Sequence, residues 1–132
     1  LKHVDLLIDR RRKISNIYNQ KLKHLEYEGF LKLPEELSPC KNHQSTYQNY
    51  EIQATKRDEL KDFLSSNGVG TIIQWGGFSI SHLDSLGYDI NKLPSTKDLF
   101  QKLLLLPMNH LIKNEEVIYI TKLINNFYES KN

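Results

Sequence analysis

The sequence has almost no cysteine and no long apolar run. Cys40 is the only cysteine, which excludes an internal disulfide bond and zinc sites built from several cysteines. Such sparing use of cysteine is typical of a reducing compartment, so we expect a cytoplasmic protein. No apolar run approaches the ~20 residues that a membrane-spanning helix needs, and the first residues show no signal-peptide pattern. We therefore expect no membrane partner.

A strong excess of one charge is also missing. The 132 residues include 18 Lys and Arg and 16 Asp and Glu, a net charge of +2, so the basic footprint of a nucleic-acid-binding protein is absent. The one basic run, from Arg10 to Lys13, is interpreted as the solvated face of a helix. A nucleic-acid binder that uses this run is the weakest alternative, and no nucleic-acid partner is expected.

The remaining composition is that of an ordinary globular domain. Hydrophobic residues make up 39% and charged residues 26% of the chain, values that exclude disordered and collagen-like classes. A chain of this length is expected to bury one core, so residues 1–132 are treated as a single domain. The chain begins at Leu1, already within an amphipathic pattern. We expect that it was cut from something longer.

The first half of the chain alternates helix and strand patterns. Apolar residues recur at three- and four-residue steps over 2–25, which predicts a long amphipathic helix. A short edge strand over 30–33 and a loop over 34–45 follow. Period-2 alternation predicts a half-buried strand over 46–54. Thereafter we expect a helix over 56–67, capped by Thr55 and stopped at Gly68, and a short buried strand over 69–73.

The second half is read as mostly helical. One helical turn is expected over 80–86, ending at Gly87. Ser95 is expected to cap a helix over 96–104, and Pro107 to end the apolar run 103–106. Asn114 is expected to cap a last helix over 115–129. The pattern predicts a small α/β (α+β) domain in which helices flank the strands.

No residue set for chemistry stands alone. The five histidines share no metal-ligand spacing, so no metal site is expected. The exit from the predicted strand over 69–73 combines Gln74 and Trp75 with Gly76 and Gly77, and His82 follows. An indole, polar side chains and glycines that let a ligand approach the backbone suit the binding of a flat, polar molecule. Packing inside the core is the competing interpretation for Trp75, and packing or surface placement for His82.

The order of the motifs resembles a known family. The motifs are the basic helix with Tyr18-Asn19, the strand 47–52, the helix start 56–60, the stretch 68–71 and Leu105-Leu106-Pro107-Met108. Together they look like the C-terminal part of the DegT/DnrJ/EryC1/StrS family of pyridoxal-phosphate (PLP)-dependent sugar aminotransferases. The strings Tyr-Gln-Asn-Tyr-Glu-Ile and Gly-Thr-Ile-Ile-Gln-Trp-Gly-Gly look like the branch that aminates C3 of dTDP-3-keto-6-deoxyhexoses.

The resemblance implies a small, mostly antiparallel sheet flanked by helices, like the C-terminal domain of fold type I aminotransferases. Residues 1–25 would link this domain to an N-terminal domain that is absent from this sequence. That domain would carry the Schiff-base lysine and most contacts to PLP, and its homodimer interface would enclose the active sites. The cofactor would take an amino group from glutamate and pass it to a nucleotide-linked ketosugar. This chain alone is expected to bind no PLP and to have no catalytic residues or activity.

The resemblance also places substrate contacts on this chain. Gln74 and Trp75, with Gly76 and Gly77, would form a wall that faces the nucleotide-sugar, and the domain would close over the active site. His82, Tyr47 and Gln48 are further candidates for substrate binding. Because Gln74 stands where many family members have histidine, an acid/base role there is in doubt and a binding role fits better. The alternatives are a stand-alone ligand-binding or regulatory α/β module, or an inactive aminotransferase remnant.

Overall fold

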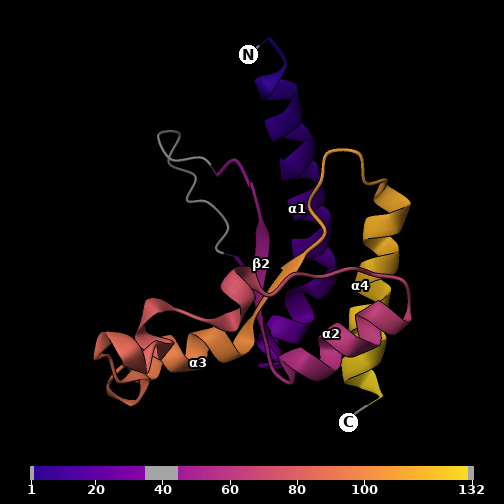
Figure 1. Ribbon diagram of the computed structural model, residues 1–132. Helices are drawn as coiled ribbons and strands as arrows, with labels where there is room; N and C mark the ends of the chain where they lie inside the picture. Colours follow the sequence, from indigo (N-terminus) through magenta and orange to yellow (C-terminus); the bar gives the residue numbers. More distant parts are fainter. Residues whose placement is uncertain (1, 35–44, 131–132) are drawn as a thin grey trace.

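The structure, a computed structural model, describes residues 2–34 and 45–130. Figure 1 shows a long first helix beside the last helix, with the strands next to them. The main elements are α1 (Val4–Tyr27), β1 (Leu31–Lys32), β2 (Tyr50–Ala54), α2 (Arg57–Ser66), α3 (Pro94–Lys102), β3 (Leu103–Leu106) and α4 (Asn114–Glu129). Four short 3₁₀ turns lie between α2 and α3: η1 (Gln74–Gly77), η2 (Ile80–His82), η3 (Asp84–Leu86) and η4 (Ile90–Lys92).

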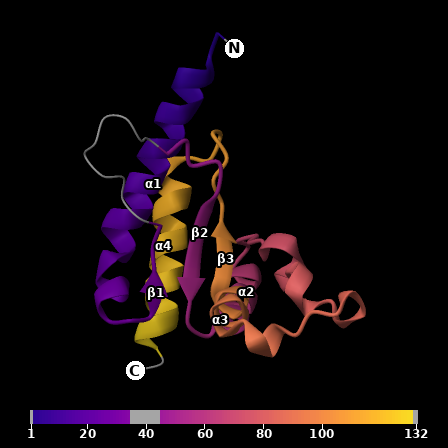
Figure 2. The ribbon, with the colours of Figure 1, turned by 90° about the vertical axis from the view of Figure 1, so that its left-hand side faces the viewer.

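The sheet is antiparallel and is covered by helices on one face. Its order is β1-β2-β3, with Tyr50 opposite Leu106 and Ile52 opposite Leu104. These four side chains are 0–3% exposed, so one face of the sheet is core. Figure 2 shows α1 and α4 on that side, while the segment from η1 to α3 extends from the other side. The predicted α/β class with a small antiparallel sheet is therefore confirmed.

The spacing of apolar residues predicted the long helix α1 correctly. Ile14, Tyr18, Leu22 and Leu25 are 0–1% exposed, as expected for a stripe that packs against the core. The helix itself runs two residues further in the C-terminal direction than the predicted 2–25. Gly29, with φ of +80°, follows its end. A left-handed residue there suits glycine, which has no Cβ to clash.

The predicted buried strand over 69–73 is wrong. Val69 is buried, but Ile72 is 65% exposed and forms only an isolated antiparallel bridge to Leu105. The two backbone hydrogen bonds of this bridge measure 3.2 and 2.8 Å. The pairing stops because the η1 turn begins at Gln74 and takes the chain away from the sheet. Similarly, the strand expected over 46–54 is regular only from Tyr50 onward.

The predicted helix over 96–104 combines two different elements. α3 starts at Pro94 and ends at Lys102, and the next four leucines form β3. Leucine favours helices by propensity, but pairing with β2 decides the conformation here. The expected caps also differ, since Lys56, Leu93 and Lys113 occupy the N-cap positions instead of Thr55, Ser95 and Asn114.

Candidate functional site

The Gln74–Trp75–Gly76–Gly77 segment forms a tight exposed turn. Trp75, Gly76 and Gly77 have φ angles of +55°, +64° and +82°. The glycines adopt this left-handed conformation at little cost, whereas a tryptophan there is strained. Trp75 is nevertheless 75% exposed, so packing inside the core is the wrong interpretation for this residue. The turn presents an indole to solvent on a defined backbone.

Gln74 connects this turn to the sheet. Its amide is placed between Glu51 of β2 and the Trp75 indole. With the amide nitrogen toward β2, Gln74 donates to Glu51 Oε2 at 2.8 Å and its oxygen accepts from Trp75 Nε1 at 3.1 Å. This orientation satisfies both partners, and it is the chemically consistent one because a carboxylate only accepts and an indole N–H only donates. Gln74 is half-buried, so the turn is hydrogen-bonded to the sheet face opposite the helices.

Glu51 is a site residue that the sequence did not single out. It lies on the outward face of β2, between the buried Tyr50 and Ile52. Partial burial raises the pKa of its carboxyl above the ordinary glutamate value. A polar residue on the outer face of a half-buried strand is common. Only the folded chain brings Glu51 next to Gln74, 23 positions later, so no local signal could have identified it.

His82 lies further along the same segment but in its own environment. Its Nδ1 accepts from the Ser79 backbone N–H at 3.0 Å and lies 2.8 Å from Ser79 Oγ. The ring packs edge-on against Phe78 and Phe100, with centroid distances of 5.8 and 5.6 Å. These contacts fix the turn from Ser79 to His82. They favour packing as the role of His82, and its role in substrate binding stays a prediction.

Tyr47 and Gln48 lie on the approach to β2. Tyr47 is half-buried against the core and shares a hollow of about 410 Å³ with Lys32 and Glu51. Gln48 is exposed and lines a different hollow, of about 370 Å³, together with Gly70 and Ile72. The structure therefore brings both residues to the part of the sheet from which the Gln74 turn departs.

The basic run of α1 is partly engaged within the domain. Arg10 donates from Nη1 to Asn114 Oδ1 at 2.6 Å and from Nη2 to the carbonyl of Ile112. Arg12 donates from Nε to the carbonyl of Ser45 at 3.2 Å. These two guanidinium groups attach α1 to the start of α4 and to the segments that precede α4 and β2. This arrangement gives no support to nucleic-acid binding through the run.

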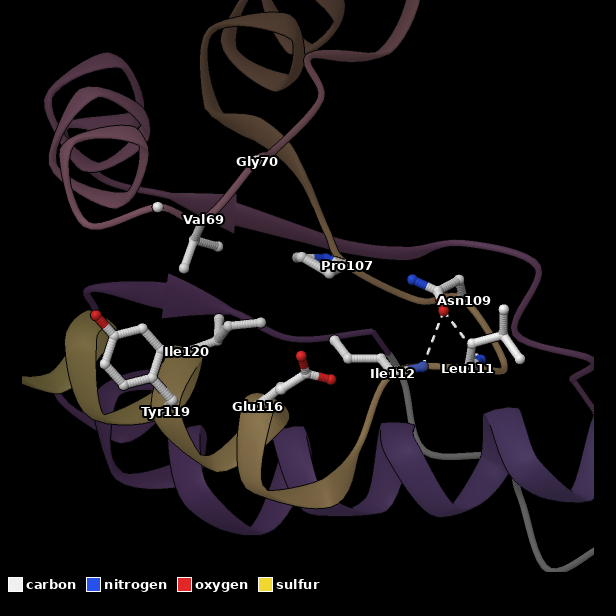
Figure 3. Close-up of a pocket in the computed structure, with 10 residues that line it drawn as sticks. Val69, Gly70, Pro107, Asn109, Leu111, Ile112, Glu116, Tyr119 and Ile120 are labelled. Atoms are coloured by element: carbon white, nitrogen blue, oxygen red, sulfur yellow. Dashed lines mark hydrogen bonds between the residues drawn. The ribbon is translucent and has the colours of Figure 1, made fainter.

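Another hollow, of about 530 Å³, lies between α4 and the segments around Val69 and Pro107. Figure 3 shows Asn109 Oδ1 accepting from the backbone nitrogens of Leu111 and Ile112, at 2.9 and 2.8 Å. Glu116 Oε2 likewise accepts from the Lys113 backbone at 2.7 Å. The polar groups around this hollow thus serve the chain's own turns, and none of the predicted site residues lines it.

The described residues offer little to a metal or to PLP. They contain no cluster of three or more His, Cys, Asp or Glu that could hold a metal ion. Each lysine in the described ranges is exposed or half-buried, so none occupies the enclosed, water-poor position that suits a Schiff-base lysine. Within the same residues, no helix is both long and apolar enough to cross a bilayer.

The segment from η1 to α3 exposes many large apolar side chains. Figure 2 shows this segment extending away from α1 and α4. Trp75, Phe78, Ile80 and Leu86 are 58–75% exposed, and Leu83, Tyr88 and Leu93 are 42–52% exposed. Exposed apolar residues concentrated on one segment usually mark a surface that binds another molecule or domain.

Comparison with known proteins shows to which family the chain belongs. A model of the DegT/DnrJ/EryC1/StrS aminotransferase family matches residues 1–125. The chain belongs to this family. A "pleiotropic regulatory protein" of Geobacillus stearothermophilus is 32% identical over 130 residues, which are 96% of this chain and 33% of that protein. The chain therefore spans about a third of the length of this relative.

Solved structures of aminotransferases share the fold. The aminotransferase TlmJ from Streptoalloteichus hindustanus matches 100% of this chain and 34% of its own, with a TM-score of 0.83 and 22% identity. Spr1654 from Streptococcus pneumoniae, provisionally described as a sugar aminotransferase and solved in a PLP form, matches 98% of this chain and 33% of its own. Its TM-score is 0.82 and its identity 18%. At such identities the likeness establishes the fold of this chain.

Proposed function

We propose that this chain is the C-terminal domain of a PLP-dependent sugar aminotransferase. The whole protein transfers an amino group from glutamate to a nucleotide-linked ketosugar, a dTDP-3-keto-6-deoxyhexose. The family match over residues 1–125 supports the aminotransferase class. The observation that carries the role of this domain is the turn at Gln74–Gly77, which holds an exposed indole beside a hydrogen-bonded amide.

The turn has the chemistry of a substrate wall. The Trp75 ring offers a flat apolar surface on which a sugar or a nucleobase can stack, and Gly76 and Gly77 leave room for a bulky ligand. Gln74 can neither gain nor lose a proton in the physiological range, so its contribution is orientation. Tyr47, Gln48 and His82 are proposed as weaker contacts with the same substrate.

An N-terminal domain of the same protein is the proposed partner. The curated relative and the solved structures are about three times as long as this chain. In our proposal α1 links the two domains, the exposed segment from η1 to α3 lies in the cleft between them, and the whole protein is a homodimer. The N-terminal domain binds PLP, which supplies the chemistry of amino transfer when bound. The described residues of this chain bind and orient the substrate and exclude water.

Replacement of Trp75 by alanine in the full-length protein tests this proposal. Loss of a stacking aromatic ring is worth about 1–3 kcal/mol, so we expect the KM for a dTDP-3-keto-6-deoxyhexose to rise roughly tenfold. The kcat should change less, because the ring does not touch the reacting atoms. Steady-state kinetics with glutamate as amino donor provide the measurement.

Tyr27→Ala is the matched control, because Tyr27 is another exposed aromatic residue, 80% exposed, at the end of α1 and outside the segment from η1 to α3. It should leave the KM unchanged. An unchanged KM and kcat in Trp75→Ala would contradict the assignment of the turn as a substrate wall. Equal effects in both variants would instead mean that the change is not specific to the turn.

A further inference from the structure

Gln74 links Trp75 to Glu51 through two hydrogen bonds, and the direction of each bond is fixed. Gln74 Nε2 donates to Glu51 Oε2, and Gln74 Oε1 accepts from Trp75 Nε1. A carboxylate has no proton to donate, so the amide nitrogen of Gln74 must face Glu51. The amide oxygen is then left for the indole N–H, which only donates. Rotation of the amide by half a turn would bring donor against donor at the indole and acceptor against acceptor at Glu51.

The orientation of the Trp75 side chain depends on its hydrogen bond to Gln74, because an exposed ring has few packing contacts to hold it. It is 75% exposed, and its backbone is in the strained left-handed region at φ 55°. Such a conformation persists only where surrounding contacts hold it in place. The hydrogen bond to Gln74 is a directional contact of this kind, and Gln74 is in turn held by the sheet through Glu51.

We propose that Glu51 is the positioning residue of the Gln74–Trp75 turn: as an obligate acceptor it selects one orientation of the Gln74 amide, and that amide orients the indole. The significance of this for substrate recognition rests on the proposed function, in which Trp75 forms the substrate wall. Glu51 acts through Gln74 and does not itself contact the substrate. The specificity of the wall is then set by a strand residue outside the turn.

The surroundings of Glu51 make its protonation state a usable probe. Its titratable neighbours in the hollow on the sheet face are Lys32 from β1 and Tyr47 from the approach to β2. β3 contributes Leu105 opposite Glu51, and η1 contributes Gln74. Partial burial raises the pKa of Glu51. As the pH falls through this pKa, the carboxyl gains a proton that it can donate, and the fixed direction of the hydrogen bonds is lost.

Nuclear magnetic resonance of the indole N–H tests the proposal directly, because Trp75 is the only tryptophan of the 132-residue chain. Glu51→Gln keeps the shape of residue 51 but allows either amide direction. We expect the indole resonance to shift and its exchange with solvent at a fixed pH to become about fivefold faster, the factor associated with one net hydrogen bond. Asp62→Asn, a matched change at an 80% exposed side chain of α2, should change neither.

A second measurement needs no substitution. In the unaltered chain, the indole chemical shift should titrate at acidic pH, with a midpoint above that of an ordinary glutamate, and Glu51→Gln should abolish this titration. An indole resonance that is the same in Glu51→Gln, or a titration that survives in this variant, would overturn the proposal. Circular dichroism of each variant confirms that the comparison is made between folded proteins.

The outcome is separable from that of the proposed function. If Glu51→Gln shifts the indole N–H resonance and speeds its exchange, while Trp75→Ala leaves the KM of the full-length protein unchanged, then Glu51 positions the turn but the turn is no substrate wall. If Trp75→Ala raises the KM but the indole N–H resonance is unchanged in Glu51→Gln, the turn is a substrate wall and Glu51 does not position it. If both hold, Glu51→Gln in the full-length protein should raise the KM, by less than Trp75→Ala does.

Discussion

Replacing Tyr50 with alanine should destabilise the domain by ~3–5 kcal/mol, the range found when a buried aromatic side chain is removed from a core. Tyr50 is 0% exposed at the start of β2, and its ring stacks on that of Tyr18 at a centroid distance of 4.6 Å. The substitution would leave a cavity between the sheet and α1. Urea denaturation followed by circular dichroism measures the free energy of unfolding.

Tyr50→Phe separates the ring from its hydroxyl group. The hydroxyl donates to Asn19 Oδ1 of α1, so its removal takes one hydrogen bond from a buried amide, at a cost of about 1–2 kcal/mol. The ring stacking stays in place. A loss below about 1 kcal/mol in Tyr50→Ala would contradict the packing of β2 against α1. Equal losses in both variants would mean that the hydroxyl carries the whole effect.

Replacing Leu104 with alanine should cost about 2–5 kcal/mol. Leu104 is 0% exposed in β3 and lies opposite Ile52, on the face of the sheet that the helices cover. Its loss would open a cavity in the centre of the core. Comparison with Leu105, on the other face of β3, tests the register of the strand that the sequence did not predict. The free energy of unfolding is measured as for Tyr50.

Leu105→Ala provides the matched control in the same strand. Leu105 is half-buried on the opposite face, where it lies opposite Glu51 and forms the bridge to Ile72. Its truncation should cost less than about 1 kcal/mol, since little buried area is lost. In the strand, Leu104 faces the core and Leu105 faces the other way, because successive side chains of a strand point to opposite faces. A larger loss at Leu105 than at Leu104 would therefore contradict the strand register.

Some features of the candidate site were predicted from the sequence, and others became visible only in the structure. The glycines beside Trp75 indicated a backbone that a ligand can approach, with core packing of the indole as the competing interpretation. The structure places Trp75 at 75% exposure in a tight turn. The sequence missed Glu51, because its partnership with Gln74 depends on how the chain folds back onto β2. His82 was associated with the turn by its position in the sequence alone, and in the structure it packs between two phenylalanine rings.

By itself the sequence determined the long helices and the two faces of β2. These follow from hydrophobic period, which each segment carries independently of its neighbours. Only the tertiary structure decided that residues 103–106 form a strand and that 69–73 do not. A short apolar run suits either conformation, and the available partner selects one. For Leu103–Leu106 the free edge of β2 was that partner, whereas the η1 turn removed the chain from the sheet after Ile72.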